Sequence, residues 1–236
     1  MPNTAPLSKS LTQSAVSLAL AEDLGRAGDI TSQSVIPENA RAKASIVSRE
    51  EGVLAGLDLA VEAFTQNDPA AVFTNIVSDS AKVSPGDTVL TIEANARGLL
   101  SGERVALNFV SHLSGIASHT ADFVAAISGT QARITCTRKT TPGLRALEKY
   151  AVRSGGGYNH RFGLDDAILI KDNHIAVAGS VTAALKAAKE NAGHMVTVEI
   201  EIDTLEQLDE ALQEGTDVVL LDNMSPDMLR EAVTMV

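Results

Sequence analysis

The sequence predicts an α/β protein in which an N-terminal region of mixed helices and strands precedes part of an α/β barrel. Two observations support this prediction. From residue 131 onward, strand patterns alternate with helix patterns, which is typical of parallel sheets with crossover helices. Polar clusters also follow the predicted strands at or just past their C-terminal ends, where the active sites of barrels are built.

The N-terminal region begins with an amphipathic helix over residues 10–24, and Gly25 is suited to end it. Apolar and β-branched residues then predict two strands with a helix between them. A turn at 84–88 leads into the strand VLTIE, and a long helix starts at Ser101, its predicted N-cap. The two strands cover residues 42–48 and 71–78, and the helix between them covers residues 56–67.

The barrel region alternates four strands with four helices. The strands are ARITCTR (132–138), AILIK (167–171), VTVEIEI (196–202) and DVVLLD (217–222), and the helices cover residues 142–153, 180–191, 204–214 and 226 onward. Proline suits the first turn of a helix, as at Pro142 and Pro226. Because a closed barrel needs more than four strands, we expect it to be incomplete here, with its C-terminal strands missing from this chain or replaced in some other way.

Composition excludes several classes of protein. The formal net charge of −11 argues against a nucleic-acid-binding surface, which must be basic. Cys136 is the only cysteine, so an internal disulfide and a structural thiolate zinc site are excluded, and we expect this side chain inside a strand. No apolar run is long enough to span a bilayer, and the N-terminus lacks a secretory signal pattern, which predicts a cytoplasmic protein.

Positive charge is concentrated in one segment of this acidic chain. Residues 133–171 contain eight Lys or Arg residues against three acidic residues. This excess predicts a cationic pocket for a small anion. We assign three of the eight cations to solvated helix faces instead: Arg145, Lys149 and Arg153.

Two cation-rich clusters follow predicted strands. In the first, Arg138 and Lys139 close the strand ARITCTR, and two adjacent cations suit an anionic ligand because an Arg side chain matches a carboxylate with two hydrogen bonds. In the second, three glycines at 155–157 allow unusual backbone angles and close approach of a ligand. His160 and Arg161 follow them, and Lys171 opens the sequence KDNH after the next strand.

Two carboxylate clusters complete the candidate site. Glu199 and Glu201 point to the same side of a strand, and Asp222 precedes Asn223 at the end of the last strand. We favour a structural ion pair for Glu199, and we favour Glu201 and Asp222 for the site. Carboxylate oxygens are the protein ligands that Mg²⁺ prefers, so these two side chains are the predicted magnesium ligands.

Five motifs in order resemble the quinolinate phosphoribosyltransferases, the carboxylating nicotinate-nucleotide pyrophosphorylases. They are EDLGRAGDIT (22–31), ARGLLSGERVALNFVSHLSGIAS (96–118), TRKTTPGLRALEKYAVRSGGGYNHRFGLDDAILIKDNHI (137–175), VEIE (198–201) and LLDNMSP (220–226). The third motif is long enough to be highly specific, and the resemblance extends from about residue 15 to the end of the chain.

The resemblance implies an N-terminal α/β sandwich domain over residues 1–112, which includes the start of the long linking helix, and a truncated α/β barrel domain over residues 113–236. It implies a cytoplasmic homodimer, and possible higher oligomers, whose active sites are shared between subunits. The reaction that it implies joins quinolinate to phosphoribosyl pyrophosphate with loss of carbon dioxide and pyrophosphate, gives nicotinate mononucleotide for NAD biosynthesis, and uses Mg²⁺.

The resemblance also implies roles for individual residues. Arg104 would reach into the site of the partner subunit. The residues that would bind quinolinate and phosphoribosyl pyrophosphate are Arg138, Lys139, His160, Arg161 and Lys171. Glu201 and Asp222 would lie beside the ribose and the metal ions, and with Lys139 they would form the catalytic set.

Three alternatives remain open at this point. The segment VSPGDTVLTIEAN (83–95) resembles a lipoyl or biotinyl hairpin, although no modifiable lysine occurs between Val83 and Leu100. A phosphoribosyltransferase of the same fold could act on a monocarboxylate such as nicotinate. The third alternative is a non-catalytic role, because in the family the strands that hold the ribose 5-phosphate follow the LDN strand and this chain ends before them.

Overall fold

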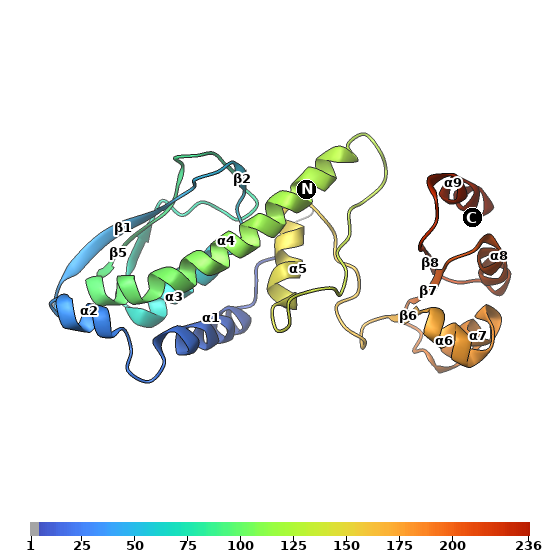
Figure 1. The fold of residues 1–236 in the computed structure, drawn as a ribbon, viewed down its shortest axis with the longest axis horizontal. Helices are drawn as coiled ribbons and strands as arrows, with labels where there is room; N and C mark the ends of the chain where they lie inside the picture. The colour runs from blue at the N-terminus through green and yellow to red at the C-terminus, as the bar shows by residue number, and fades with distance from the viewer. Residues whose placement is uncertain (1–4) are drawn as a thin grey trace. The chain divides into compact units, whose positions relative to one another are not determined.

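The computed structural model describes residues 5–236 and divides into two compact units (Figure 1). The first unit extends to His160, and the second comprises Arg161–Val236. Within residues 5–236, no helix combines the length and the apolar character that crossing a bilayer requires. The mixed α/β composition that the sequence predicted is confirmed.

The first unit packs helices against small antiparallel sheets. Strand β5 lies between β1 and β3 in one sheet, with Ala44 opposite Ile92, and β2 pairs with β4 in another. The strands are β1 (Arg41–Val47), β2 (Gly52–Val53), β3 (Val72–Thr74), β4 (Lys82–Val83) and β5 (Thr88–Asn95). The helices are α1 (Lys9–Leu24), α2 (Ile30–Val35), α3 (Leu57–Asn67), α4 (Ala96–Ala126) and α5 (Arg145–Ser154).

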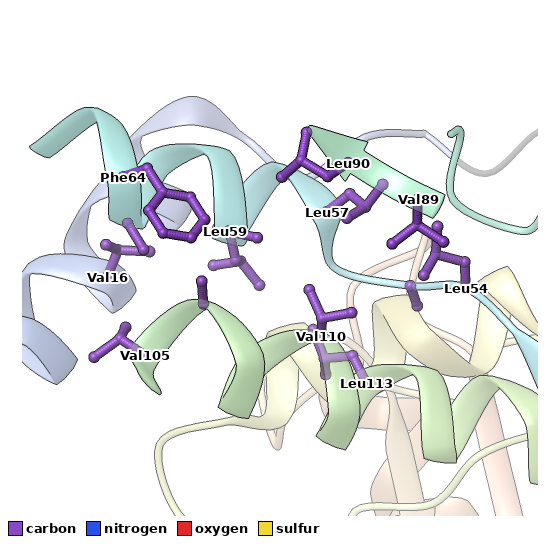
Figure 2. Packing of buried hydrophobic residues seen from close by; sticks show 14 of the residues in the cluster. Val16, Leu54, Leu57, Leu59, Phe64, Val89, Leu90, Val105, Val110 and Leu113 are labelled. Atoms are coloured by element: carbon purple, nitrogen blue, oxygen red, sulfur yellow. The ribbon is translucent and has the colours of Figure 1, made fainter. Parts of the chain in front are cut away.

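A single apolar core holds the first unit together (Figure 2). Leu59 of α3, Leu90 of β5 and Leu113 of α4 have no exposed surface, and burying each such side chain contributes about 1.5–3 kcal/mol. Helix α3 lies close to α4 because Gly56, at a φ of 91°, has no Cβ; a Cβ there would lie 2.8 Å from the Leu113 side chain. The long helix α4 is therefore fixed along the core.

Several predicted boundaries differ from those observed. The long helix begins at Ala96 rather than Ser101, because the Asn95 side chain accepts hydrogen bonds from the N–H groups of Arg97 and Gly98 and caps the helix earlier. Ser101 lies inside the helix and donates to Asp29 (Oγ–Oδ2, 3.2 Å). The strand predicted at 71–78 is shorter, and the sequence did not predict α2, α6, β2 or β4.

The segment ARITCTR was predicted as a full strand, and this prediction is wrong. Only Thr135 forms a bridge, parallel to Tyr158, supported by the hydrogen bonds Tyr158 N to Ile134 O (2.8 Å) and Cys136 N to Tyr158 O (3.0 Å). Its β-branched and apolar residues give the right pattern, but no longer strand lies beside it within this unit to extend the ladder.

The lipoyl-like alternative also fails, because its two strands do not form a hairpin. Strand β4 pairs with β2, whereas β5 pairs with β1 and β3 in a different sheet. The turn between Ser84 and Asp87 therefore does not close a hairpin of the kind that presents a modified lysine.

The second unit is a parallel α/β arrangement, as predicted. Its strands β6 (Ile168–Ile170), β7 (Val198–Ile202) and β8 (Val218–Leu221) are parallel neighbours in that order. Side chains of one face of β7 are buried in a core with the helices: Val198, Ile200 and Ile202. The helices are α6 (Asp172–Ala178), α7 (Val181–Asn191), α8 (Leu205–Glu214) and α9 (Pro226–Met235).

Asp79 connects α5 to the core of the first unit. Its carboxylate accepts hydrogen bonds from the N–H groups of Gly56 (2.7 Å) and Leu57 (3.2 Å) at the start of α3, and from the Tyr150 hydroxyl (2.7 Å). Tyr150 is only 5% exposed, and its burial together with the bond to Asp79 raises the pKa of its hydroxyl well above the usual value.

We expect Tyr150→Phe to lower the free energy of unfolding by about 1.5–3 kcal/mol, the usual range for a hydrogen bond to a charged group. Urea unfolding followed by circular dichroism measures this change. Tyr158→Phe is the matched control, because no hydrogen bond of the Tyr158 hydroxyl is observed in the described residues. Equal stability of Tyr150→Phe and the unsubstituted protein would show that the bond to Asp79 contributes nothing.

Candidate active site

The turn after Cys136 carries the first two predicted site residues, Arg138 and Lys139. The Lys139 N–H donates to Thr137 Oγ1 (3.0 Å), and the Thr140 N–H donates to the Arg138 carbonyl (3.0 Å). The bridge to Tyr158 holds the start of this turn. We call residues 137–143 the RK turn.

The Arg138 guanidinium has an unsatisfied donor. Its Nε is buried, and no acceptor within residues 5–236 bonds to it. A buried donor without an acceptor costs about 1–3 kcal/mol, so such a group usually has a ligand or water as its partner. Lys139, next along the chain, is exposed. The first cluster is thus suited to an anion.

Glu148 on α5 contacts this turn, and the sequence did not identify it as a site residue. Its Oε2 accepts from the Thr141 N–H (3.1 Å), and its Oε1 lies 3.0 Å from Nε2 of His112 on α4. Burial by itself opposes ionisation of Glu148, but the hydrogen bonds from Thr141 and His112 outweigh it and lower the pKa of the carboxyl below its usual value.

This lowered pKa predicts a pH-dependent contribution to stability. Because the folded pKa lies below the unfolded value, the contribution is complete above about pH 4.5 and is lost as the pH falls through the folded pKa. We expect the difference in unfolding free energy between the unsubstituted protein and Glu148→Gln to shrink between pH 5 and 3, as measured by urea unfolding. A constant difference over this interval would contradict the assignment.

The prediction that Lys149 lies on a solvated helix face is wrong. Its side chain is only 1% exposed, and Nζ donates to Cys136 Sγ (2.8 Å) and to the His160 carbonyl (3.0 Å). Helical periodicity placed Lys149 among polar neighbours, but its side chain is buried where α5 meets the segments that contain Cys136 and His160. Lys149 therefore holds the residues that precede the RK turn close to His160.

The three glycines serve packing as well as backbone freedom. Gly156 has a φ of 90°, as expected of a glycine there, but Gly155 lies against α4. A Cβ on Gly155 would lie 2.2 Å from the Ala117 carbonyl oxygen. The close approach that the sequence predicted is thus an approach of protein backbone.

Arg161 begins the second unit, and its loop has an internal anchor. Arg161 donates to the Ala167 carbonyl (Nη1–O, 2.9 Å). Asp166, which the sequence did not identify as an anchor, accepts from the N–H groups of Phe162 (2.6 Å) and Gly163 (2.9 Å). These bonds lower the pKa of its carboxyl. These bonds run from amides three and four residues before the aspartate, and no pattern in the local sequence identified them.

The structure brings Lys171 and Glu201 together. Lys171 follows β6, Glu201 lies on the neighbouring strand β7, and the distance from Nζ to Oε2 is 2.6 Å. The Glu201 side chain is 15% exposed and that of Lys171 is 44% exposed. Glu199 and Glu201 share the face of β7 opposite the buried Val198 and Ile200, as the alternation predicted.

Asp222 lies at the end of β8 and is exposed. Its Oδ2 accepts from Asn223 Nδ2 (3.0 Å), which also lies 3.4 Å from Asp203 Oδ1, at the end of β7. Asn223 has a φ of 54°, the left-handed conformation that Asn tolerates. Asp203 is a further carboxylate at this edge of the sheet that the sequence did not single out.

No group of three or more metal-ligating side chains occurs in the part of the chain that the structure describes. Glu201 and Asp222 therefore supply at most part of a metal coordination sphere. Mg²⁺ commonly takes one or two carboxylates and completes its shell with water and substrate phosphates, so two carboxylates at one sheet edge fit this kind of site.

Arg104 is exposed on α4 and lines a groove of about 940 Å³ in the first unit. The wall of this groove also carries Arg49, Glu50, Glu51 and Glu103. The role in a partner subunit that the resemblance implies for Arg104 stays a prediction.

Comparison with known proteins gives matches over most of the chain. Two family models match, the N-terminal domain of quinolinate phosphoribosyl transferase over residues 29–114 and its C-terminal domain over residues 116–236. A probable nicotinate-nucleotide pyrophosphorylase (carboxylating) from Bacillus subtilis is 49% identical over 209 residues, covering 89% of this chain and 72% of the relative.

Solved structures agree with these sequence matches. NadC from Streptococcus pyogenes superposes with a TM-score of 0.94 at 43% identity, over 98% of this chain and 81% of that protein. The nicotinate-nucleotide pyrophosphorylase from Francisella tularensis superposes with a TM-score of 0.92 at 38% identity, over 100% of this chain and 83% of that protein.

Proposed function

Because the chain belongs to the quinolinate phosphoribosyltransferase family, we infer that it joins quinolinate to phosphoribosyl pyrophosphate. It is a pentosyltransferase of NAD biosynthesis, and its product is nicotinate mononucleotide. The pyridine nitrogen forms a bond to C1 of the ribose as the bond from C1 to pyrophosphate breaks. The 2-carboxylate then leaves as carbon dioxide, and the electron pair left on the ring carbon takes up a proton.

The buried, unsatisfied Nε of Arg138 is the observation that carries the proposed binding of quinolinate. Quinolinate has two adjacent carboxylates, which require several cationic donors. Arg138 supplies donors in a fixed planar arrangement, and Lys139 beside it supplies a compact charge. We assign His160, Arg161 and Lys171 to the same substrates as further donors.

Glu201 and Asp222 are proposed to act on the donor sugar. Positive charge develops on the ribose as pyrophosphate departs, and a nearby carboxylate stabilises it. The ion pair with Lys171 supports this role, because it fixes the position of the Glu201 side chain. Bound Mg²⁺, held by Glu201 and Asp222, would neutralise the pyrophosphate. Lys139 completes the proposed catalytic set by pairing with developing negative charge.

The assembly is also a proposal. A homodimer would let the exposed Arg104 of α4 reach the site of a partner subunit, and the groove beside it offers a surface for that contact. For the fold, we propose an α/β sandwich domain over residues 1–112 and a barrel domain from residue 113, to which β6, β7 and β8 contribute parallel strands.

A substrate comparison tests the function. The protein is incubated with Mg²⁺, phosphoribosyl pyrophosphate and either quinolinate or nicotinate, and nicotinate mononucleotide and carbon dioxide are measured. We expect product only with quinolinate, in equal amounts with carbon dioxide, because the cations are suited to a dicarboxylate. Turnover of nicotinate without turnover of quinolinate would instead support the monocarboxylate alternative.

A further inference from the structure

Glu148 lies on α5, outside the residues assigned to the substrates, and its two carboxylate oxygens contact two different parts of the first unit. One accepts from the Thr141 N–H of the RK turn, and the other contacts His112 of α4. We propose that Glu148 is a positioning residue, which fixes the RK turn so that Arg138 and Lys139 hold the orientation needed to bind quinolinate. This inference rests on the proposed assignment of Arg138 and Lys139 to that substrate.

The surroundings of Glu148 strengthen this contact. Glu148 is 8% exposed, so its carboxylate is shielded from competing water. Hydrogen bonds from N–H groups to an ionised carboxylate are about twice as strong as neutral ones, and they are stronger still where water is excluded. The base of the contact is also fixed, because the neighbouring Leu147 and Ala151 of α5 belong to the hydrophobic core.

The contact point lies close to the residues that it would position. Thr141 is two residues from Lys139, and the preceding Thr140 donates its N–H to the Arg138 carbonyl (3.0 Å). A displacement of Thr141 is therefore passed to the backbone of Arg138 through one hydrogen bond and one peptide unit. Displacing a binding group by about 1 Å is enough to reduce activity by about a hundredfold.

The RK turn has further anchors besides Glu148, so loss of Glu148 need not unfold it. Arg145 Nε donates to Thr140 Oγ1 (3.1 Å), a neutral hydroxyl. The Leu144 N–H also donates to the Thr141 carbonyl (3.0 Å) and closes the turn locally. We therefore expect substitutions of Glu148 to change how the turn is oriented while the first unit stays folded.

The test uses Glu148→Leu, which removes both contacts, and Glu148→Gln, whose amide oxygen still accepts from Thr141. The Kd of quinolinate is measured by isothermal titration calorimetry, and amide exchange at Thr141 by NMR, in the same samples. For Glu148→Leu we expect Kd to rise about ten- to a hundredfold and Thr141 exchange to accelerate. For Glu148→Gln we expect Kd within about threefold of the unsubstituted protein.

A purely structural role gives a different result, because partial unfolding lowers the number of binding sites and leaves Kd unchanged. That outcome, or unchanged exchange at Thr141 in Glu148→Leu, would overturn the proposal. If Glu148→Leu does not fold, Glu148→Asp takes its place, since its shorter side chain keeps the charge and draws back from Thr141. Arg138→Ala distinguishes an error in the site assignment from an error in the role of Glu148. Quinolinate binding unaffected by this change would refute the assignment of Arg138 to quinolinate, whereas amide exchange at Thr141 would still report on Glu148.

Discussion

Replacing Arg138 with Ala should reduce kcat/KM for quinolinate by about a hundredfold or more, because two charge-assisted hydrogen bonds to a carboxylate are lost. The same substitution should leave the unfolding free energy nearly unchanged, within about 1 kcal/mol. The Arg138 Nε is buried without an acceptor in the described part of the chain, so its removal also relieves an unsatisfied donor. Steady-state kinetics and urea unfolding measure the two effects.

Arg133→Ala is the matched control for this experiment. It removes the same charge from the same cation-rich segment, and its guanidinium lies over the Tyr158 ring at 4.7 Å instead of in the RK turn. We expect its kcat/KM to stay within about threefold of the unsubstituted protein, since a single exposed charge acts on a bound substrate mainly through screened, long-range attraction. Near-normal turnover by Arg138→Ala, or an equal loss in both variants, would tell against a direct contact between Arg138 and quinolinate.

Alternation of side chains made the second unit predictable from sequence. Burial of Val198 and Ile200 places Glu199 and Glu201 together on the other face of β7, whatever the rest of the fold. The contact between Lys171 and Glu201 then follows from parallel pairing, in which Ile170 lies opposite Ile200. Strand periodicity and the position of polar residues at strand ends were sufficient here.

Helix periodicity was less informative, since it identifies a polar face without showing what that face meets. Glu148 and Lys149 have the composition of a solvated face, yet both are buried, because the RK turn and the chain near His160 cover α5. The Ser101 prediction was wrong for a different reason: several residues can cap a helix, and the Asn95 side chain caps this one earlier by accepting from the N–H groups of Arg97 and Gly98. Contacts of α5 with segments outside the helix decided the burial of Glu148 and Lys149, and helix periodicity carries no information about such contacts.

Lys149→Met is the substitution from which we expect the largest loss of stability. Methionine fills much of the same volume but cannot donate to Cys136 Sγ or to the His160 carbonyl. Losing a hydrogen bond from a charged donor to a carbonyl costs about 1.5–3 kcal/mol, and the contact to sulfur adds less. We therefore expect a loss of about 2–3 kcal/mol by urea unfolding, and a Tm lower by about 4–12 °C for a chain of this size.

Lys82→Met is the control, because this lysine is exposed on β4 and its substitution should change stability by less than about 0.5 kcal/mol. A double-mutant cycle with Cys136→Ala separates the contribution of the Cys136 thiol from that of the His160 carbonyl. If the bond to the His160 carbonyl dominates, Lys149→Met should cost nearly as much in the Cys136→Ala background as in the unsubstituted protein. If the thiol dominates, the second substitution should add little to the first, because both partners of that contact are then gone. A Lys149→Met protein as stable as Lys82→Met would mean that relief of the buried charge offsets both lost bonds, and that Lys149 does not hold the chain near His160 in place.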